Sequence, residues 1–445
     1  MPVIKSIDVW DDGKYRKFCR AELPMKTGEC GIDPEKGVWE EWLIGMVRNA
    51  RPENRKPMRV YLKPTPHVIR DQNVPLRGWY KSKVEPKGVR PRPCYTEALL
   101  TQPYGGRCPL NCVMCYINNG VRGYRGQGIS VVDPEYPVKI EKQLSEMNFG
   151  WAAYISGYTE PFQPLEEVYH NVEQLSEVLT SYGLPIFYLT RRIPPDWAVK
   201  YLKRSRFSYM QYSIITCDQE DHRKICPRAA LLDDTYRSIR ELRDQGIYIS
   251  IQVDPIIPGI TSQEQVVELI GQLARAGAHH LIFKFVEMVE SAAPVMMYRM
   301  KRLFPDRWER FAELWCENIG NVRNIRESYR VESLNLYKHA CEMNGVTMSL
   351  CFEFCYERDA AGNIMDKTGV NMGPRFLTAD QCHGQRVPIH IKHEGRFVPW
   401  DVCPPSGCLY CREACGSDIP CGVPYLAEAH ALKPEDYRRE YWRTR

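Results

Sequence analysis

The central part of the chain alternates short apolar runs with amphipathic stretches. Each run has the length of a buried strand, and each stretch repeats apolar residues three and four positions apart, as a helix does. Strands are expected at residues 98–102, 152–156, 186–190, 209–215, 248–253 and 280–285. Helices are expected near 138–147, at 165–182, from 195, at 231–245 and at 263–276.

This alternation predicts an α/β fold. Strand–helix–strand units with such short spacing pair in parallel through right-handed crossovers, so the six strands form one sheet covered by helices. Six units suit a partial (β/α)6 TIM-like barrel, because eight units would need a longer patterned region. An open doubly wound sheet is the competing topology. In both, functional residues are expected in the loops just after the strands.

The pattern weakens on both sides of residues 95–293, the predicted barrel, and 445 residues are too many for one ordinary compact domain. Residues 1–94 are expected to form an N-terminal extension that packs on the barrel, with one helix at 38–47 and an extended segment at 51–92. No sustained strand pattern appears there. Residues 294–345 form a helical connection with helices at 296–303, 308–317 and 331–343, and a strand-like segment at 346–355 opens a Cys-rich C-terminal domain at 346–445.

Composition narrows the function classes. No eighteen apolar residues stand together and the N-terminus lacks a signal-peptide pattern, so a soluble cytoplasmic protein with no membrane partner is expected. The net charge of +5 is spread along the chain and gives no strong nucleic-acid signal. The cytosol keeps thiols reduced, so the clustering of the eighteen cysteines indicates metal binding.

Three cysteines follow the first expected strand in a loop rich in Gly and Pro. Cys108, Cys112 and Cys115 have the spacing C-x3-C-x2-C. Three thiolates on so tight a loop can bind three irons of a [4Fe-4S] cluster and leave the fourth iron open to a ligand. A zinc site completed by a distant His or Cys is the alternative, but closed zinc sites usually have two C-x2-C-like pairs, and no second pair follows nearby. The spacing therefore favours a cluster with an open iron site.

The motif C-x3-C-x2-C after a first strand resembles the radical S-adenosylmethionine (radical SAM) superfamily. Three further stretches, at 156–166, 225–229 and 254–259, look like its spore-photoproduct-lyase-like branch. The resemblance implies S-adenosylmethionine (SAM) as a cofactor and an external electron donor such as flavodoxin or ferredoxin. It also favours the partial barrel over the doubly wound sheet.

The resemblance implies a reaction type without naming the substrate. Members of the superfamily reductively cleave SAM at the cluster, and the 5′-deoxyadenosyl radical then takes a hydrogen atom, here from a small-molecule or nucleotide-like substrate. A less usual variant transfers the 3-amino-3-carboxypropyl group of SAM, for instance to a soft acceptor such as arsenic(III). A zinc-stabilised binding protein without enzymatic activity is the alternative from another class. No cobalamin-binding Asp-x-His-x-x-Gly motif and no glycine-rich phosphate loop occurs.

The loop after the second strand is the first candidate for SAM binding. By resemblance, Gly157, Thr159 and Glu160 hold the position that binds the methionyl amine, with Gly-Tyr-Thr-Glu in place of the familiar Gly-Gly-Glu. Met114, or Tyr116 on the other side of Cys115, is a candidate for contact with adenine. The simpler interpretation of each residue is packing or helix capping.

Later loops add further candidates. Ser213 and Thr216 are candidates for the ribose or the carboxylate of SAM, with Arg228 as a salt partner of the carboxylate. Asp254 follows the fifth strand and is assigned to the same cofactor site. Thr and Asp after a strand cap the next helix as often as they bind a ligand, so the convergence of the loops carries the prediction.

Cys217 and Cys226 are candidates for a catalytic thiol. In the photoproduct-lyase-like branch a thiol can return hydrogen to the product radical, and both residues are expected in or near the barrel mouth. The simpler interpretation is a pair of buried thiols without chemistry.

A second cysteine group near the C-terminus predicts another metal site. Four thiols on a Pro/Gly turn suit an auxiliary iron–sulfur cluster, with zinc as the rival because both metals use C-x2-C turns. The four are Cys403, Cys408, Cys411 and Cys415, and the spare ligands are Cys421, Cys382, Cys351 and Cys355.

Overall fold

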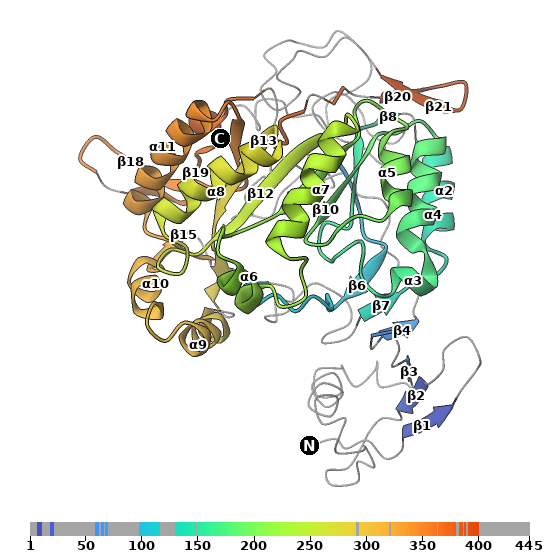
Figure 1. Ribbon diagram of the computed structural model, residues 1–445, viewed down its shortest axis with the longest axis horizontal. Helices are drawn as coiled ribbons and strands as arrows, with labels where there is room; N and C mark the ends of the chain where they lie inside the picture. Colours follow the sequence, from blue (N-terminus) through green and yellow to red (C-terminus); the bar gives the residue numbers. More distant parts are fainter. Residues whose placement is uncertain are drawn as a thin grey trace.

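A parallel sheet of seven strands forms the centre of the computed structural model (Figure 1). The structure describes residues 64–65, 98–115, 130–147, 149–290, 293–319, 322–362, 364–379, 382–385, 387–388 and 390–399, and the strands at 7–10, 18–21, 58–61 and 67–69. The strand order is β17-β13-β12-β11-β10-β9-β5, and every neighbouring pair is parallel. The predicted α/β class with a parallel sheet is therefore confirmed.

The six predicted strands are all present, and a seventh joins them. The predicted ones are β5 (Ala98–Thr101), β9 (Ala152–Ile155), β10 (Ile186–Thr190), β11 (Tyr209–Ser213), β12 (Tyr248–Ile256) and β13 (His280–Phe285). The seventh, β17 (Thr347–Leu350), pairs in parallel with β13. The count of six was wrong, because the strand-like segment expected to open a separate C-terminal part completes this sheet.

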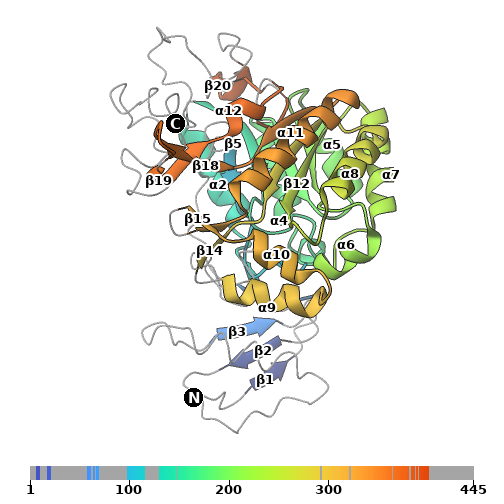
Figure 2. The same ribbon diagram turned by 90° about the vertical axis from the view of Figure 1, so that its left-hand side faces the viewer.

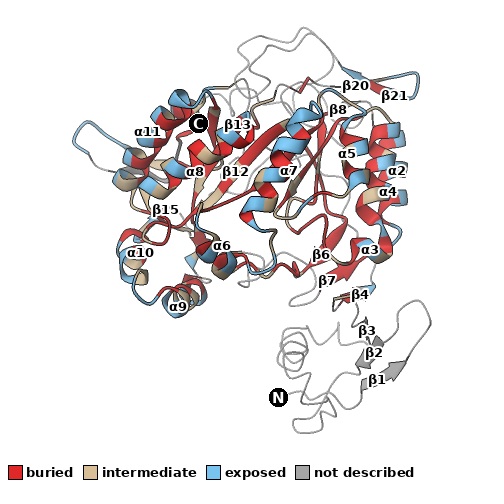
Figure 3. Cartoon of the chain, viewed as in Figure 1, coloured by how far each residue is buried: buried red, intermediate tan, exposed pale blue. Residues whose placement is uncertain are grey.

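Helices cover the outer face of the sheet, with their buried sides turned toward it (Figure 3). They are α2 (Tyr136–Glu146), α4 (Asn171–Ser181), α5 (Asp196–Leu202), α7 (Leu232–Asp244), α8 (Gln263–Ala276) and α11 (Glu327–Met343). Figure 2 shows α7 and α8 on one side and the hairpin of β18 (Phe354–Arg358) and β19 (Ile364–Asn371) on the other. In the part of the chain that the structure describes, no helix is long and apolar enough to cross a bilayer.

Helix α8 shows how the sequence sets an element's bounds. Ser262 and Gln265 form a capping box at its start, and Gly277 ends it with φ 106°. A Cβ on Gly277 would meet the Arg243 side chain, so glycine is required for both conformation and space. The helix spans the predicted residues.

The predicted helix at 165–182 is instead two helices, α3 (Glu166–Tyr169) and α4. His170 separates them with φ 52°. The Glu166 carboxylate accepts hydrogen bonds from the backbone amides of Val172 (2.9 Å) and Glu173 (2.8 Å). Because it caps the first amides of α4, the chain can begin a new helix there.

Three helices and a sheet of three short strands, of order β14-β16-β15, lie at the carboxyl ends of the main strands. They are α6 (Gln219–Ile225), α9 (Ala293–Leu303), α10 (Trp308–Leu314), β14 (Met288–Val289) and β16 (Val322–Asn324), which pairs with β15 (Glu317–Ile319). Helix α6 was not predicted, since its seven residues carry few apolar positions.

The N-terminal extension contributes strands to a second sheet of order β1-β2-β3-β4-β7-β6. Its members are β1 (Ile7–Trp10), β2 (Phe18–Ala21), β3 (Met58–Tyr61), β4 (His67–Ile69), β6 (Tyr104–Gly106) and β7 (Ser130–Val132). No sustained strand signal appears in the sequence there, because strands of three or four residues leave little periodicity. Buried His67 bonds Tyr169 Oη (2.7 Å) and so joins the extension to α3. The helix predicted at 38–47 lies outside the described residues.

The remaining described elements belong to the C-terminal part. Helix α12 (Gly373–Phe376) follows β19. Strands β20 (His390–His393) and β21 (Arg396–Pro399) form a hairpin that pairs with β8 (Phe149–Gly150). These contacts return the chain to the amino-end side of the barrel.

Candidate functional site

The cysteine loop lies between β6 and β7, close to the carboxyl ends of the main strands. Cys108 and Cys112 are buried and Cys115 is partly exposed. Two successive turns hold the loop, with Asn111 N bonded to Cys108 O (3.4 Å) and Cys115 N bonded to Cys112 O (3.2 Å). Asn111 has φ 55°, a left-handed conformation that asparagine tolerates well. The loop thus fixes the three predicted thiols on one short segment.

A fourth thiol, Cys226, stands against this loop. Val113 N donates to Ile225 O (2.8 Å), and this bond brings Cys226 next to Cys112. The hydrogen bond from Cys226 lowers the pKa of the Cys112 thiol to about 7, and the same bond together with burial raises the pKa of Cys226. The sequence placed Cys226 near the mouth but gave no sign of this pairing.

The partly buried guanidinium of Arg191 joins the thiols to the sheet. Its Nη1 donates to Cys226 Sγ (3.4 Å) and Ser213 O (3.2 Å), and its Nη2 donates to Asp254 O (2.8 Å). Burial alone would lower the pKa of Arg191. The negative groups around the guanidinium, chiefly Cys226 and Cys112, have the larger effect, so the pKa of Arg191 is raised. A cation next to a thiol stabilises the thiolate, which is the form that binds metal.

The donor set fits an iron–sulfur cluster by its chemistry. Cys108, Cys112 and Cys115 form no disulfide. Within the described ranges, no three His, Cys, Asp or Glu side chains are arranged to hold a metal ion. Three thiols on one short loop are the donor set that binds three irons of a [4Fe-4S] cluster.

Two further arginines contact carbonyl groups of the loop. Arg228 Nη1 donates to Pro109 O (2.8 Å), and Arg299 Nη1 donates to Val113 O (3.5 Å). A third, Arg107, bonds Asn111 Oδ1 (2.7 Å). Burial lowers the pKa of Arg107, and repulsion by Arg299 and Arg228 lowers it further. Three positive side chains from separate segments therefore surround the cysteine loop.

Glu160 ties the loops after β9 and β10 together. Its carboxylate accepts from Thr190 Oγ1, from Arg191 N (3.0 Å) and from Phe162 N (3.2 Å). Burial raises its pKa despite these bonds. The hydrogen bonds fix the backbone of Arg191 and make Glu160 at least a positioning residue.

The neighbouring candidates Gly157 and Thr159 have clear structural roles. Thr159 Oγ1 accepts from Gln102 Nε2 (2.9 Å) and donates to Tyr104 O (3.0 Å). A Cβ on Gly157 would come within 2.5 Å of Leu100 Cδ1. Both residues therefore shape the loop, whatever they bind.

The candidates after β11 divide between two sides. Ser213 Oγ donates to Asp254 O (3.2 Å), beside Arg191. Buried Thr216 accepts from Asp218 N (3.1 Å), and Asp218 in turn caps α6 by accepting from Asp221 N (2.7 Å). The Cys217 thiol donates to Gln265 O (3.5 Å) and lies against α8. Cys217 therefore lies apart from Cys226, which stands beside Cys112 at the cysteine loop.

A polar row lies on the inner face of the sheet. Side chains alternate along β12, where Ile249, Ile251 and Val253 are fully buried within the main hydrophobic core. Gln252 and Asp254 therefore point to the opposite, inner face, and Gln252 Nε2 donates to Asp254 Oδ2 (2.9 Å). The inner face carries hydrophilic groups where a filled barrel would carry apolar layers.

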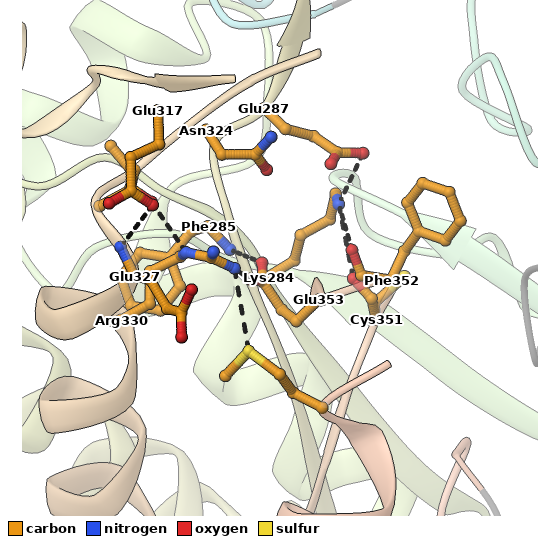
Figure 4. Close-up of polar contacts among 12 residues, drawn as sticks. Lys284, Phe285, Glu287, Glu317, Asn324, Glu327, Arg330, Cys351, Phe352 and Glu353 are labelled. Atoms are coloured by element: carbon orange, nitrogen blue, oxygen red, sulfur yellow. Dashed lines mark hydrogen bonds and ion pairs between the residues drawn. The ribbon is translucent and has the colours of Figure 1, made fainter. Parts of the chain in front are cut away.

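Lys284 extends this polar row onto β13 (Figure 4). Its Nζ lies 3.0 Å from Glu287 Oε1 and donates to Phe352 O (3.3 Å) and Cys351 O (3.5 Å). Burial opposes its charge, but Glu287 and Glu353 outweigh burial and raise its pKa. Phe352 has φ 59°, which lets two successive carbonyls face the ammonium. Lys284 was not among the residues predicted for the site.

Next to Lys284, a buried ion pair fastens β17 to α11 and β13. Arg330 Nη1 lies 2.7 Å from Glu353 Oε2, and the two side chains are 0% and 3% exposed. Glu353 Oε1 accepts from Phe285 N (2.7 Å), and Arg330 Nε donates to Ile325 O (2.8 Å). Figure 4 shows this pair beside Lys284.

Asp254 gives a testable pH dependence. Burial raises its pKa from 3.8 to about 6, although Lys284 and Arg191 act in the opposite direction. Between these pH values the folded protein holds one more proton than the unfolded chain, so its free energy of unfolding falls as pH rises from about 4 to about 6. We expect Asp254→Asn to lack this fall.

Urea unfolding at a series of pH values checks this prediction. The stability of Asp254→Asn relative to the parent should increase through the window and level off above it. Asp306→Asn, at an exposed position, is the control and should run parallel to the parent. Parallel curves for both variants would show that Asp254 titrates alike in the folded and unfolded chains.

The other predicted site residues are distributed as follows. Met114 is buried within the cysteine loop. Cys382 is buried at the amino end of the sheet, where its carbonyl accepts from Ser349 Oγ (2.5 Å), far along the strands from the cysteine loop. The residues Tyr116, Cys403, Cys408, Cys411, Cys415 and Cys421 lie outside the described residues.

Comparison with known proteins gives matches over most of the chain. Residues 103–283 match the model of the Radical SAM superfamily. The Radical SAM Nalpha-GlyT isomerase of Pseudomonas phage M6 is 41% identical over 406 residues, which are 89% of this chain and 84% of that protein.

Among solved structures, spore photoproduct lyase complexed with dinucleoside spore photoproduct has a TM-score of 0.43 at 14% identity, over 55% of this chain and 74% of that one. SuiB of Streptococcus suis bound to S-adenosylmethionine has a TM-score of 0.40 at 14% identity, over 58% and 50%. The family match at residues 103–283 includes the cysteine loop and strands β9 to β12 of the main sheet.

Proposed function

The chain belongs to the radical SAM superfamily of enzymes, and from this premise we propose that it catalyses a SAM-dependent radical isomerisation. Membership implies a [4Fe-4S] cluster and SAM as cofactors, and it removes the alternative of a non-enzymatic zinc-binding protein. The observation that carries the proposal is the loop of Cys108, Cys112 and Cys115 beside partly buried Arg191 at the carboxyl ends of a parallel sheet. When bound, the cluster supplies the electron that cleaves SAM and releases the radical that abstracts hydrogen from substrate.

The residues of this chain hold and orient the reactants. Cys108, Cys112 and Cys115 are the proposed cluster ligands, and Arg191 stabilises their negative charge. Glu160 holds the Arg191 backbone in place. The inner face between Ser213 and Asp254 is the proposed surface for SAM, since both meet Arg191 next to the cysteine loop. Arg228, fixed on the loop carbonyl of Pro109, stays a candidate for the SAM carboxylate.

The proposed substrate is the compound in the name of the phage relative, Nalpha-GlyT, or a close analogue. The polar inner face supports a hydrophilic substrate. The Gln252 amide and the Asp254 carboxylate offer a donor and acceptors, and partly buried Lys284 adds a cation with raised pKa nearby. Such groups orient a polar molecule against the radical source.

An anaerobic assay tests the proposal. Reconstituted protein, SAM, dithionite and Nalpha-GlyT should give an isomer with the mass of the substrate. When the product radical takes its hydrogen back from 5′-deoxyadenosine, SAM is used catalytically. When dithionite and water supply a second electron and a proton instead, one 5′-deoxyadenosine remains per isomer. Methylthioadenosine in place of deoxyadenosine would indicate the 3-amino-3-carboxypropyl variant instead. Protein that binds iron and yields neither product would contradict the proposed function.

We also propose the auxiliary cluster at the C-terminal cysteines. Replacing Cys403, Cys408, Cys411 and Cys415 together by serine should lower the iron content from about eight to about four per chain. The serine substitutions leave the rest of the C-terminal part in place. A truncation before Cys382 would also remove the Cys382 carbonyl, which accepts a hydrogen bond from Ser349 at the amino end of the sheet. Unchanged iron with loss of one zinc would assign the tail to zinc, and no change in either metal would contradict a second site.

A further inference from the structure

Helix α9 lies directly beside the cysteine loop. Arg299, in its middle, donates to Val113 O (3.5 Å), inside the cysteine motif. Met296 and Met300 are buried and anchor the helix on the barrel. Figure 1 shows α9 with α6 and α10 at the end of the barrel where the cysteine loop lies. A protein that binds the outer side of α9 therefore comes close to the predicted cluster.

The outer side of α9 is both apolar and basic. Val295 and Tyr298 are 42% and 66% exposed, and Arg302 continues the same stripe at helical spacing. Lys301 is exposed next to it, and α9 contains no acidic residue. We call Val295, Tyr298, Lys301 and Arg302 the α9 face.

The positive charge continues from the α9 face to the cysteine loop. Arg299 and exposed Arg228 contact loop carbonyls, and Arg107 bonds Asn111 Oδ1 within the loop, so three guanidinium groups lie at this end of the molecule. Guanidinium groups that repel one another create a positive field over this end of the molecule. An acidic partner relieves that repulsion when it binds.

We propose that the α9 face docks an acidic electron-donor protein of the flavodoxin class. This inference rests on the proposed function, because SAM cleavage needs one electron per turnover. The donor's reduced flavin loses that electron, and the electron is consumed when a C–S bond of SAM breaks to give methionine and the 5′-deoxyadenosyl radical. Opposite charge steers the encounter, and the exposed Val295 and Tyr298 supply the apolar contact of a small transient interface.

Charge reversal on the α9 face tests the docking. Lys301→Glu/Arg302→Glu should weaken the binding of oxidised flavodoxin to the reconstituted protein on the order of tenfold, since these rim charges steer association. Binding is measured by titration calorimetry at about 0.1 M salt, and at about 1 M salt the parent should fall to the same level as the variant. Tyr298→Ala should weaken binding with little change in the salt dependence.

Lys200→Glu/Arg240→Glu is the matched control. It makes the same change of charge on exposed positions of α5 and α7 and should leave binding unchanged. Equal loss of binding affinity in both double variants would show that only the net charge of the protein matters and would contradict a specific docking surface. Unchanged affinity in Lys301→Glu/Arg302→Glu would overturn the proposal.

A comparison of dithionite with flavodoxin as the reductant tests the docking surface and the proposed function separately. Dithionite reaches the cluster without docking, so dithionite-driven deoxyadenosine formation should be the same in all variants. With flavodoxin, only the α9-face variants should lose rate. If dithionite yields no deoxyadenosine even in the parent, the proposed function fails, and the binding measurement still decides the docking surface.

Discussion

Replacement of Cys112 by alanine is expected to reduce SAM cleavage to the background of the assay. Cys112 is the central cysteine of the loop and bonds Cys226, so its loss removes one cluster ligand and leaves the neighbouring thiol without its acceptor. Two remaining thiolates cannot hold a cubane that needs three. Iron per chain should fall by about four relative to the parent, and 5′-deoxyadenosine, measured by chromatography after anaerobic reduction, should disappear.

Two other cysteine variants make this result specific. Cys316→Ala, at an exposed position, should keep the iron content and activity of the parent. Cys226→Ala keeps all three proposed ligands, so it should keep the iron content of the parent. A lower yield of isomerised product would then assign a catalytic role to the Cys226 thiol, and an unchanged yield would assign it a packing role. Full iron and full deoxyadenosine formation in Cys112→Ala, with unchanged far-UV circular dichroism, would exclude the proposed ligand role.

The elements that sequence predicted best are those whose bounds depend on local chemistry. Helix α8 has its capping box, its apolar stripe and its terminal glycine within the same short segment, and it was predicted in full. The main strands were found because each is a short apolar run set between helices. In both cases the deciding interactions are close in sequence.

Elements that depend on distant contacts were missed. The break between α3 and α4 depends on the Glu166 carboxylate, which also accepts from Tyr104, 62 residues earlier in the chain. Strand β17 resembles any short apolar segment, and only its pairing with β13, across α9 to α11, shows that it belongs to the main sheet. Periodicity contains no information on such partners.

The candidate site divides in the same way. The spacing of Cys108, Cys112 and Cys115 is a local signal and led to the family, whereas Arg191 and Lys284 become notable only by what surrounds them. Arg191 is a basic residue after a strand, and its role follows from its contacts with Cys226 and Asp254. Lys284 interrupts an otherwise apolar strand, and that interruption was the available signal for a charged inner face.

Glu353→Ala is expected to destabilise the protein by about 3–5 kcal/mol, because it leaves Arg330 buried without its counter-charge. Arg330 is 0% exposed and cannot reach water, and Phe285 N loses its acceptor at the same time. The change should also loosen β17 and the segment that holds Lys284, since Glu353 directly follows the Phe352 carbonyl that Lys284 contacts. The midpoint of urea unfolding should fall with an unchanged slope.

The matched control is Glu313→Ala, which breaks the pair with Arg310 (2.7 Å) where both side chains are 54% exposed. Solvent screens that pair, so its loss should cost at most about 1 kcal/mol. Removal of both buried charges in Arg330→Met/Glu353→Leu should recover much of the stability lost in Glu353→Ala, because the cost comes from the unpaired charge. If Glu353→Ala costs no more than Glu313→Ala, the buried pair is not what fastens β17 to the barrel. If the double variant is as unstable as Glu353→Ala, packing and the lost bonds to Phe285 N and Ile325 O matter more than the charge.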